Sequence, residues 1–168
     1  MATTQNIVNG RSGTVINKVR TTSFTQTSTT QEVIITSAPT TSTMTLLCSL
    51  TITPESSSNV LLFNFCGSFD FGQTTAAIVS LFQGTTLLTT YWNPGSFDGN
   101  LAPCPFSVGL LYQQAAGTTS STTYNIYYAY TDTTGTSGPT VYSNSFYSGA
   151  FSLGNSLSYT FTITEEIA

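Results

Sequence analysis

The feature that most constrains this chain is the distribution of its positive charges. All three basic residues, Arg11, Lys18 and Arg20, lie within the first twenty positions, and the chain contains no His. General acid–base catalysis near neutral pH usually relies on His, on Lys or on a tuned carboxylate, and a Ser-His-Asp or Cys-His centre needs an imidazole. Since residues 21–168 contain neither an imidazole nor an ammonium group, we expect a protein that is not an enzyme.

The same absence excludes a second class of function. Phosphate groups of nucleic acids are held by Arg and Lys, so we expect no nucleic-acid binding by residues 21–168. The net charge of −4 divides into +3 over residues 1–20 and −7 over residues 21–168. We therefore expect residues 1–20 to form a flexible basic arm or tether, in which Arg11, Lys18 and Arg20 bind an acidic site on a partner.

Length and composition indicate one packed domain over residues 21–168. A chain of 168 residues is long enough for a single core, and its hydrophobic content of 39% argues against disorder. Charged residues make up 6% of the chain, against about 25% in ordinary soluble proteins, so the surface must be coated with hydroxyl and amide groups. Neither a spanning apolar run nor the apolar stretch of a signal peptide is present, and we expect synthesis in a cytoplasm without membrane insertion.

Alternation of apolar and polar residues predicts β-strands. Met44, Leu46, Cys48, Leu50 and Ile52 share one predicted face, and Leu47 is the one apolar residue on the other. Further strands are expected over residues 60–65, 76–82, 87–92, 106–113, 124–131, 141–147 and 157–164. No segment combines helical periodicity with capping residues. The sequence therefore predicts an all-β fold, an antiparallel β-sandwich of the jelly-roll type with about eight to ten strands.

The order of segments from about residue 19 onward resembles small jelly-roll modules of virion structural proteins, above all phage tail-fibre and related receptor-binding proteins. The segments that carry the resemblance are Thr21–Thr27, Ile52-Thr53-Pro54, Glu55–Phe65, Val79–Thr86, Thr122–Ile126 and Ser158–Ile167. The chain departs from the pattern in the Pro- and Gly-rich loop Asn93–Pro105 and in its near-total loss of charge.

This resemblance implies a compact homotrimer, of the tumour-necrosis-factor or complement-C1q type, exposed on a virus particle. It would act as a fibre head or a capsid decoration and take part in host attachment. The protein would then be made in the host cytoplasm, and its basic arm would bind other virion proteins. The receptor, the host and the choice between tail and capsid stay open.

One loop could recognise a ligand. Tyr91, Trp92, Asn93, Asp98 and Asn100 lie within ten residues and combine aromatic rings with amide and carboxylate groups. Sugar-binding sites commonly use this combination, so a host-surface glycan is the candidate ligand. The alternative is that Trp92 and the nearby Phe97 pack into the core or into a subunit contact.

The aromatic residues of the second half indicate an oligomer. They occur on both faces of their predicted strands, and one sheet face cannot hide them all; they are Tyr112, Tyr124, Tyr127, Tyr128, Tyr130, Tyr142, Phe146, Tyr147 and Tyr159. Because Tyr suits subunit contacts, we expect a homotrimer, with a monomer or a dimer as alternatives.

We expect no metal and no cofactor. Cys48, Cys66 and Cys104 have no His to complete a zinc site, and they are expected to be buried free thiols. The acidic residues lack the dense spacing of calcium ligands. Glu165 and Glu166 are adjacent, so they point to opposite faces of a strand and are expected at a solvated terminus. Two other functions stay open: a lectin-like module outside the particle, and a hydrolase that uses carboxylates alone.

Overall fold

The protein is a sandwich of two antiparallel β-sheets. The computed structural model describes residues 13–23, 25, 27–33, 37–71, 76–93, 104–131, 141–143 and 158–168. The strands within these residues are β1 (Val15–Ser23), β2 (Thr27–Thr29), β3 (Thr45–Ile52), β4 (Val60–Phe71), β5 (Ala76–Gln83), β6 (Thr86–Asn93), β7 (Cys104–Ala115), β8 (Thr122–Thr131), β9 (Val141–Ser143) and β10 (Tyr159–Glu166). The described residues contain no helix, so the all-β prediction is confirmed.

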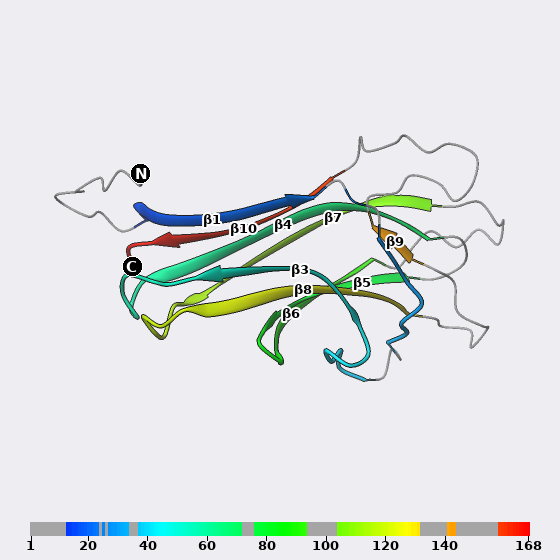
Figure 1. Ribbon diagram of the computed structural model, residues 1–168, viewed down its shortest axis with the longest axis horizontal. Helices are drawn as coiled ribbons and strands as arrows, with labels where there is room; N and C mark the ends of the chain where they lie inside the picture. The colour runs from blue at the N-terminus through cyan, green and yellow to red at the C-terminus, as the bar shows by residue number, and fades with distance from the viewer. Residues whose placement is uncertain are drawn as a thin grey trace.

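The strand order is that of a jelly roll. The first sheet runs β1-β10-β4-β7, and the short strands β9 and β2 continue it beside the far end of β4. The second sheet runs β3-β8-β5-β6. Figure 1 shows the two sheets stacked as layers, with long strands running along the long axis of the molecule. Eight long strands in two four-stranded layers, with the chain passing repeatedly between layers, confirm the predicted jelly-roll sandwich.

The main core fills the space between the sheets. β10 follows the alternation that predicts a half-buried strand, because Tyr159, Phe161 and Ile163 are buried while the threonines between them are half-buried. These side chains pack with residues of β4 and β8 such as Phe63 and Tyr128, both of which are almost fully buried. The inward-facing residues are large and aromatic, which compensates for the small number of aliphatic residues.

A second apolar cluster covers the outer face of the second sheet. Ile78, Phe82 and Ala129 point outward from β5 and β8. Val33 and Met44, from the segment between β2 and β3, pack over them. Two backbone hydrogen bonds, from Val33 N–H to Tyr130 O at 2.9 Å and from Tyr130 N–H to Gln31 O at 3.1 Å, hold that segment against the sheet. The second sheet is therefore covered on both faces, which explains why apolar residues occur at both the inward-facing and the outward-facing positions of β8.

The tyrosines of β8 lie on both faces of the second sheet, and both faces are covered by this same chain. Tyr124, Tyr128 and Tyr130 point into the main core, whereas Tyr127 points outward and packs on Phe82 with ring centroids 5.2 Å apart. The chain thus buries Tyr124, Tyr128 and Tyr130 and half-buries Tyr127 by itself. The oligomeric state stays a prediction, and Tyr142, Phe146 and Tyr147 have side chains outside the described residues.

The predicted faces of the strand at residues 44–52 are partly wrong. The β3–β8 pairing has an irregularity between Leu46 and Cys48, and the extra residue changes which side chains point inward. As a result Leu46 is 49% exposed, and Leu47 packs against the main core instead. Alternation alone cannot show such a bulge.

The last part of the expected N-terminal arm belongs to the sheet. β1 begins at Val15 and pairs with β10 from Val15↔Glu166 to Ser23↔Tyr159. The boundary expected at residue 20 therefore falls inside a strand, and Lys18 and Arg20 are exposed side chains of that strand. Residues 1–12, including Arg11, lie outside the described residues.

Candidate functional site

The predicted glycan-binding residues are only partly described by the structure. Tyr91 and Trp92 lie near the end of β6, where Tyr91 is half-buried against the main core and Trp92 is 47% exposed. Asn93 ends the strand, and nothing is described of its side chain. Asp98 and Asn100 lie outside the described residues, and the glycan site stays a prediction.

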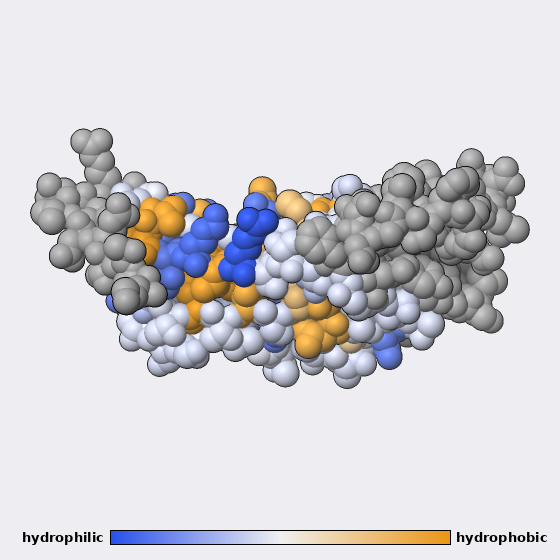
Figure 2. Space-filling view, turned by 45° about the horizontal axis from the view of Figure 1, so that its top comes forward, coloured by the Kyte–Doolittle hydropathy of each residue, from blue (hydrophilic) through white to orange (hydrophobic). Residues whose placement is uncertain are grey.

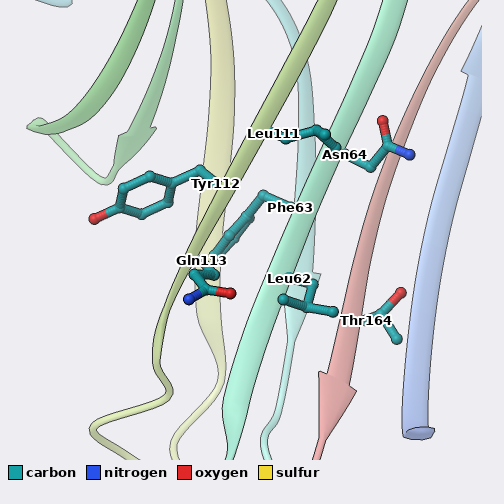
Figure 3. Close-up of a pocket in the computed structure, with 7 residues that line it drawn as sticks. All are labelled: Leu62, Phe63, Asn64, Leu111, Tyr112, Gln113 and Thr164. Carbon is teal, nitrogen blue, oxygen red and sulfur yellow. The ribbon is translucent and has the colours of Figure 1, made fainter. Parts of the chain in front are cut away.

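A shallow groove lies on the strand pair β4–β7. Its volume is about 670 Å³, and its lining consists of Leu62, Phe63, Asn64, Leu111, Tyr112, Gln113 and Thr164. Figure 3 shows Tyr112 and Phe63 extending to one side of the two strands, while Leu111 and Asn64 extend to the other. This agrees with the register, in which Phe63 pairs with Tyr112 and Asn64 pairs with Leu111. Sequence reasoning missed this groove because each of its residues fits an ordinary strand pattern.

Leu111 is the most exposed large apolar side chain of the groove. It is 76% exposed, and it stands on the outer face of the first sheet, where β7 is the last strand. Tyr112, the next residue, is half-buried, and its ring centroid lies 5.9 Å from that of Phe63. The groove at this sheet edge is therefore lined by four apolar or aromatic and three polar side chains, and none of them is charged.

The remaining surface is held together by hydroxyl and amide contacts. Exposed cross-strand pairs such as Thr51–Thr123 at 2.8 Å and Thr22–Thr160 at 3.2 Å stand where ordinary sheets place opposite charges. Ser49 similarly donates to Asn125 at 2.7 Å. Figure 2 shows the result on one face of the molecule, where pale, weakly polar surface surrounds a few orange and blue areas. Such a surface offers many hydrogen-bonding groups and few charges.

Lys18 and Arg20 project from the outer face of the first sheet. They occupy alternate positions of β1, opposite Thr164 and Thr162 of β10. Both are exposed. They remain available to an acidic partner, which is the role expected for the basic residues.

Glu165 corrects the expectation of a solvated terminus. It is fully buried, whereas its neighbour Glu166 is half-buried. The Oε1 atom of Glu165 accepts hydrogen bonds from the backbone N–H groups of Glu55 (2.8 Å) and Ser56 (3.3 Å) and from the side chain of Asn59 (2.7 Å). The sequence contains an indication of this burial, because residue 165 occupies the same face of the strand as Tyr159, Phe161 and Ile163.

The cysteines differ in their surroundings. Cys48 lies against the main core, and burial raises the pKa of its thiol to about 12. Cys66 is exposed, contrary to the expectation of a buried thiol, because it points outward from β4, and its Sγ lies 3.4 Å from Oδ1 of Asn64. Burial likewise raises the pKa of the Tyr124 hydroxyl and the Tyr159 hydroxyl; hydrogen bonds from Gln114 and Ser23 respectively act in the opposite direction.

The part of the chain that the structure describes lacks two further features. No group of three or more His, Cys, Asp and Glu side chains is close enough there to hold a metal ion. No helix of membrane-spanning length and hydrophobicity is found in the same part of the chain.

No known protein family and no curated protein matches this sequence. A structure of infectious bursal disease virus, Gx strain, is similar to the chain with a TM-score of 0.42 and 12% identity, covering 90% of this chain and 38% of the other. A structure of T=1 particles derived from infectious bursal virus has a TM-score of 0.34 and 14% identity, covering 100% of this chain and 40% of the other. The chain thus spans about two fifths of these virus-particle chains. Both TM-scores are low, so the similarity identifies neither a family nor a function.

Proposed function

We propose that the protein is a non-enzymatic structural protein of a virus particle. It would form a homotrimeric jelly roll on the particle surface, as a fibre head or a capsid decoration, and take part in host attachment. The observation that supports this most is the strand order β1-β10-β4-β7 over β3-β8-β5-β6, which is the fold implied by the sequence resemblance to virion modules. Its surface of hydroxyl and amide groups suits recognition by shape, because reactive groups are scarce.

Mass spectrometry of purified particles tests the structural role. The chain should be present in particles at a fixed ratio to the major coat protein, and antibodies against it should label intact particles. Purified protein should also compete with particles for adsorption to host cells. Absence of the chain from washed particles would refute the proposal.

The basic residues would connect the protein to other virion proteins. Because β1 begins at Val15, deleting residues 1–20 would remove most of a sheet strand and confuse attachment with folding. A deletion of residues 1–12 avoids this, and it should be compared with Lys18→Gln/Arg20→Gln in the full chain. We expect loss of incorporation with an unchanged circular dichroism spectrum in at least one of the two. Normal incorporation of both would contradict a basic attachment site.

The second candidate function is a lectin-like module outside the particle. The observation that favours it is the exposure of Trp92, since an exposed indole is a common platform for sugar rings. On a glycan array, Trp92→Ala should abolish binding, whereas Leu46→Ala, which changes a side chain of similar exposure on β3, should preserve it. Equal binding by the two variants, or no binding by the unmodified chain, would exclude a glycan site at this loop.

A further inference from the structure

Two strands form a continuous edge that contains no charge. β6 is the last strand of the second sheet and β7 is the last strand of the first. The two strands contact each other where the two sheets end on the same side of the sandwich. Residues 76–93 and 104–131 contain no Asp, Glu, Lys or Arg. We call β6 and β7, with the side chains of Tyr91, Trp92, Leu111 and Tyr112, the charge-free edge.

The opposite edge of the sandwich is protected against pairing with another strand. β1 carries the exposed cations Lys18 and Arg20 and has an irregular register near Val15. β3 has its bulge at Leu46. Charges and bulges are the features that prevent sheet edges from associating. By contrast, β7 pairs with β4 over twelve residues without a register shift, and its outer side has no strand partner among the described residues.

The charge-free edge also exposes apolar surface on both faces of the sandwich. Leu111 is 76% exposed on the outer side of the first sheet, next to the groove, and Trp92 is 47% exposed on the outer side of the second. Trp92 is no more exposed than Val15 (47%) and Leu46 (49%) at the opposite edge, so the high exposure of Leu111 and the absence of charge are what distinguish the charge-free edge as an apolar contact surface.

The charge of the chain favours a second copy of the same chain as the partner that binds the charge-free edge. The chain carries a net charge of −4, so two copies repel each other overall. The acids lie outside the strands β5–β8, and the charge-free edge therefore allows the closest approach at the lowest electrostatic cost. A charged partner, in turn, would find no opposite charge on these two strands.

We propose that the charge-free edge forms the contact between copies in the trimer, with β7 of one copy against β6 of the next. The proposal rests on the trimer of the proposed function and adds its contact surface. A three-fold ring needs two different surfaces that meet head to tail. Leu111 and Trp92 supply them, because they stand on opposite faces of the same edge.

Light scattering at micromolar concentration tests the proposal. The unmodified chain should have three times its mass of 17.9 kDa. Leu111→Lys and Trp92→Glu each place a charge in the contact and should raise the concentration for half-assembly at least tenfold. The double variant places the two opposite charges against each other and should recover much of the assembly. Leu46→Lys is the matched control, since it adds the same charge at the opposite edge and should leave the trimer intact.

The outcomes separate the contact surface from the trimer itself. If the unmodified chain is trimeric and both single variants also remain trimeric, the charge-free edge is not the contact, although the trimer stands. Failure of the double variant to recover would overturn the pairing of β7 with β6. A monomeric unmodified chain would overturn both proposals. Should a variant fail to fold, hydrogen exchange of the unmodified chain decides: amides of β7 should lose protection on dilution, and constant protection would contradict the contact.

Discussion

The side chain of Asn59 donates a 2.7 Å hydrogen bond to Oε1 of Glu165, and this contact joins the β3–β4 turn to the end of the last strand. The same oxygen accepts the backbone N–H groups of Glu55 and Ser56. Oε2 is buried without a hydrogen-bond partner among the described residues. One buried carboxylate therefore organises a turn that lies 106 residues earlier in the sequence.

Substitutions at Glu165 should show the strength of this contact. Glu165→Ala leaves the buried side chain of Asn59 and the partly buried N–H groups of Glu55 and Ser56 without their acceptor, and it should lower the free energy of unfolding by about 3 kcal/mol. Glu165→Gln keeps one acceptor oxygen but removes the charge, and the loss should be about 1 kcal/mol. Chemical denaturation measures both values. Glu166→Gln, on the neighbouring half-buried residue, is the control and should change stability by less than about 0.5 kcal/mol. Equal effects at the two positions would show that the turn does not depend on Glu165.

Gly67 should not tolerate a side chain. A Cβ atom there would lie 3.0 Å from the ring of Phe65 and 3.1 Å from Cβ of Tyr159, which cannot move without the backbone of β10. We expect Gly67→Ala to destabilise the fold by about 2 kcal/mol, as measured by thermal or chemical denaturation. Gly109→Ala is the matched control on the adjacent strand, because its Cβ would meet no atom within 4 Å. A neutral effect of Gly67→Ala would mean that the packing of β4 on β10 is loose.

Stability should fall at high pH because of Cys48. Burial raises the pKa of its thiol from 9.0 to about 12, so between these values the unfolded chain loses a proton that the folded chain keeps. The free energy of unfolding contributed by this thiol is therefore fully present below pH 9.0 and decreases by about 1.4 kcal/mol per pH unit up to about 12. The raised pKa values of Tyr124 and Tyr159 act in the same direction, so the comparison of Cys48→Ala with the unmodified chain isolates the thiol. Cys66→Ala, at an exposed position, should keep the full pH dependence.

Trypsin should distinguish a strand from a free arm. Lys18 and Arg20 lie in β1, whose pairing with β10 is extended by the hydrogen bonds Gly13 N–H to Ile167 O (2.8 Å) and Ile167 N–H to Thr14 O (3.0 Å). Cleavage after either residue requires β1 to detach, so we expect it to be slow in the native protein. After denaturation, cleavage after Arg20 should be rapid and should leave residues 21–168 uncut, since no basic residue follows. Rapid native cleavage after Arg20 would restore the flexible arm as first expected.

The sequence predicted the strands of the core well because their packing is regular. Residues 159–163 alternate between core and surface without interruption, and the nearly all-apolar run from Val60 to Phe65 forms the first half of β4. The prediction failed where regularity ends. The bulge at Leu46 exchanges the faces of part of β3, and the sequence of residues 15–20 does not indicate a strand because Asn17, Lys18 and Arg20 leave this edge segment little apolar content.

The functional surfaces were harder to predict than the fold. The loop from Tyr91 to Asn100 was singled out by its residue types, but only Tyr91 and Trp92 have described side chains. The charge-free edge depends on which strands end the two sheets, and that information comes from pairing across the whole chain. The burial of Glu165 similarly depends on a turn far away in the sequence.

Native mass spectrometry of the full chain is the most direct test of the central claim, that this jelly roll works as an assembling structural subunit. At micromolar concentration the dominant species should have three times the chain mass of 17.9 kDa. It should dissociate into single chains, and no species larger than the trimer should appear. A spectrum that contains only the 17.9 kDa chain at that concentration would contradict the account.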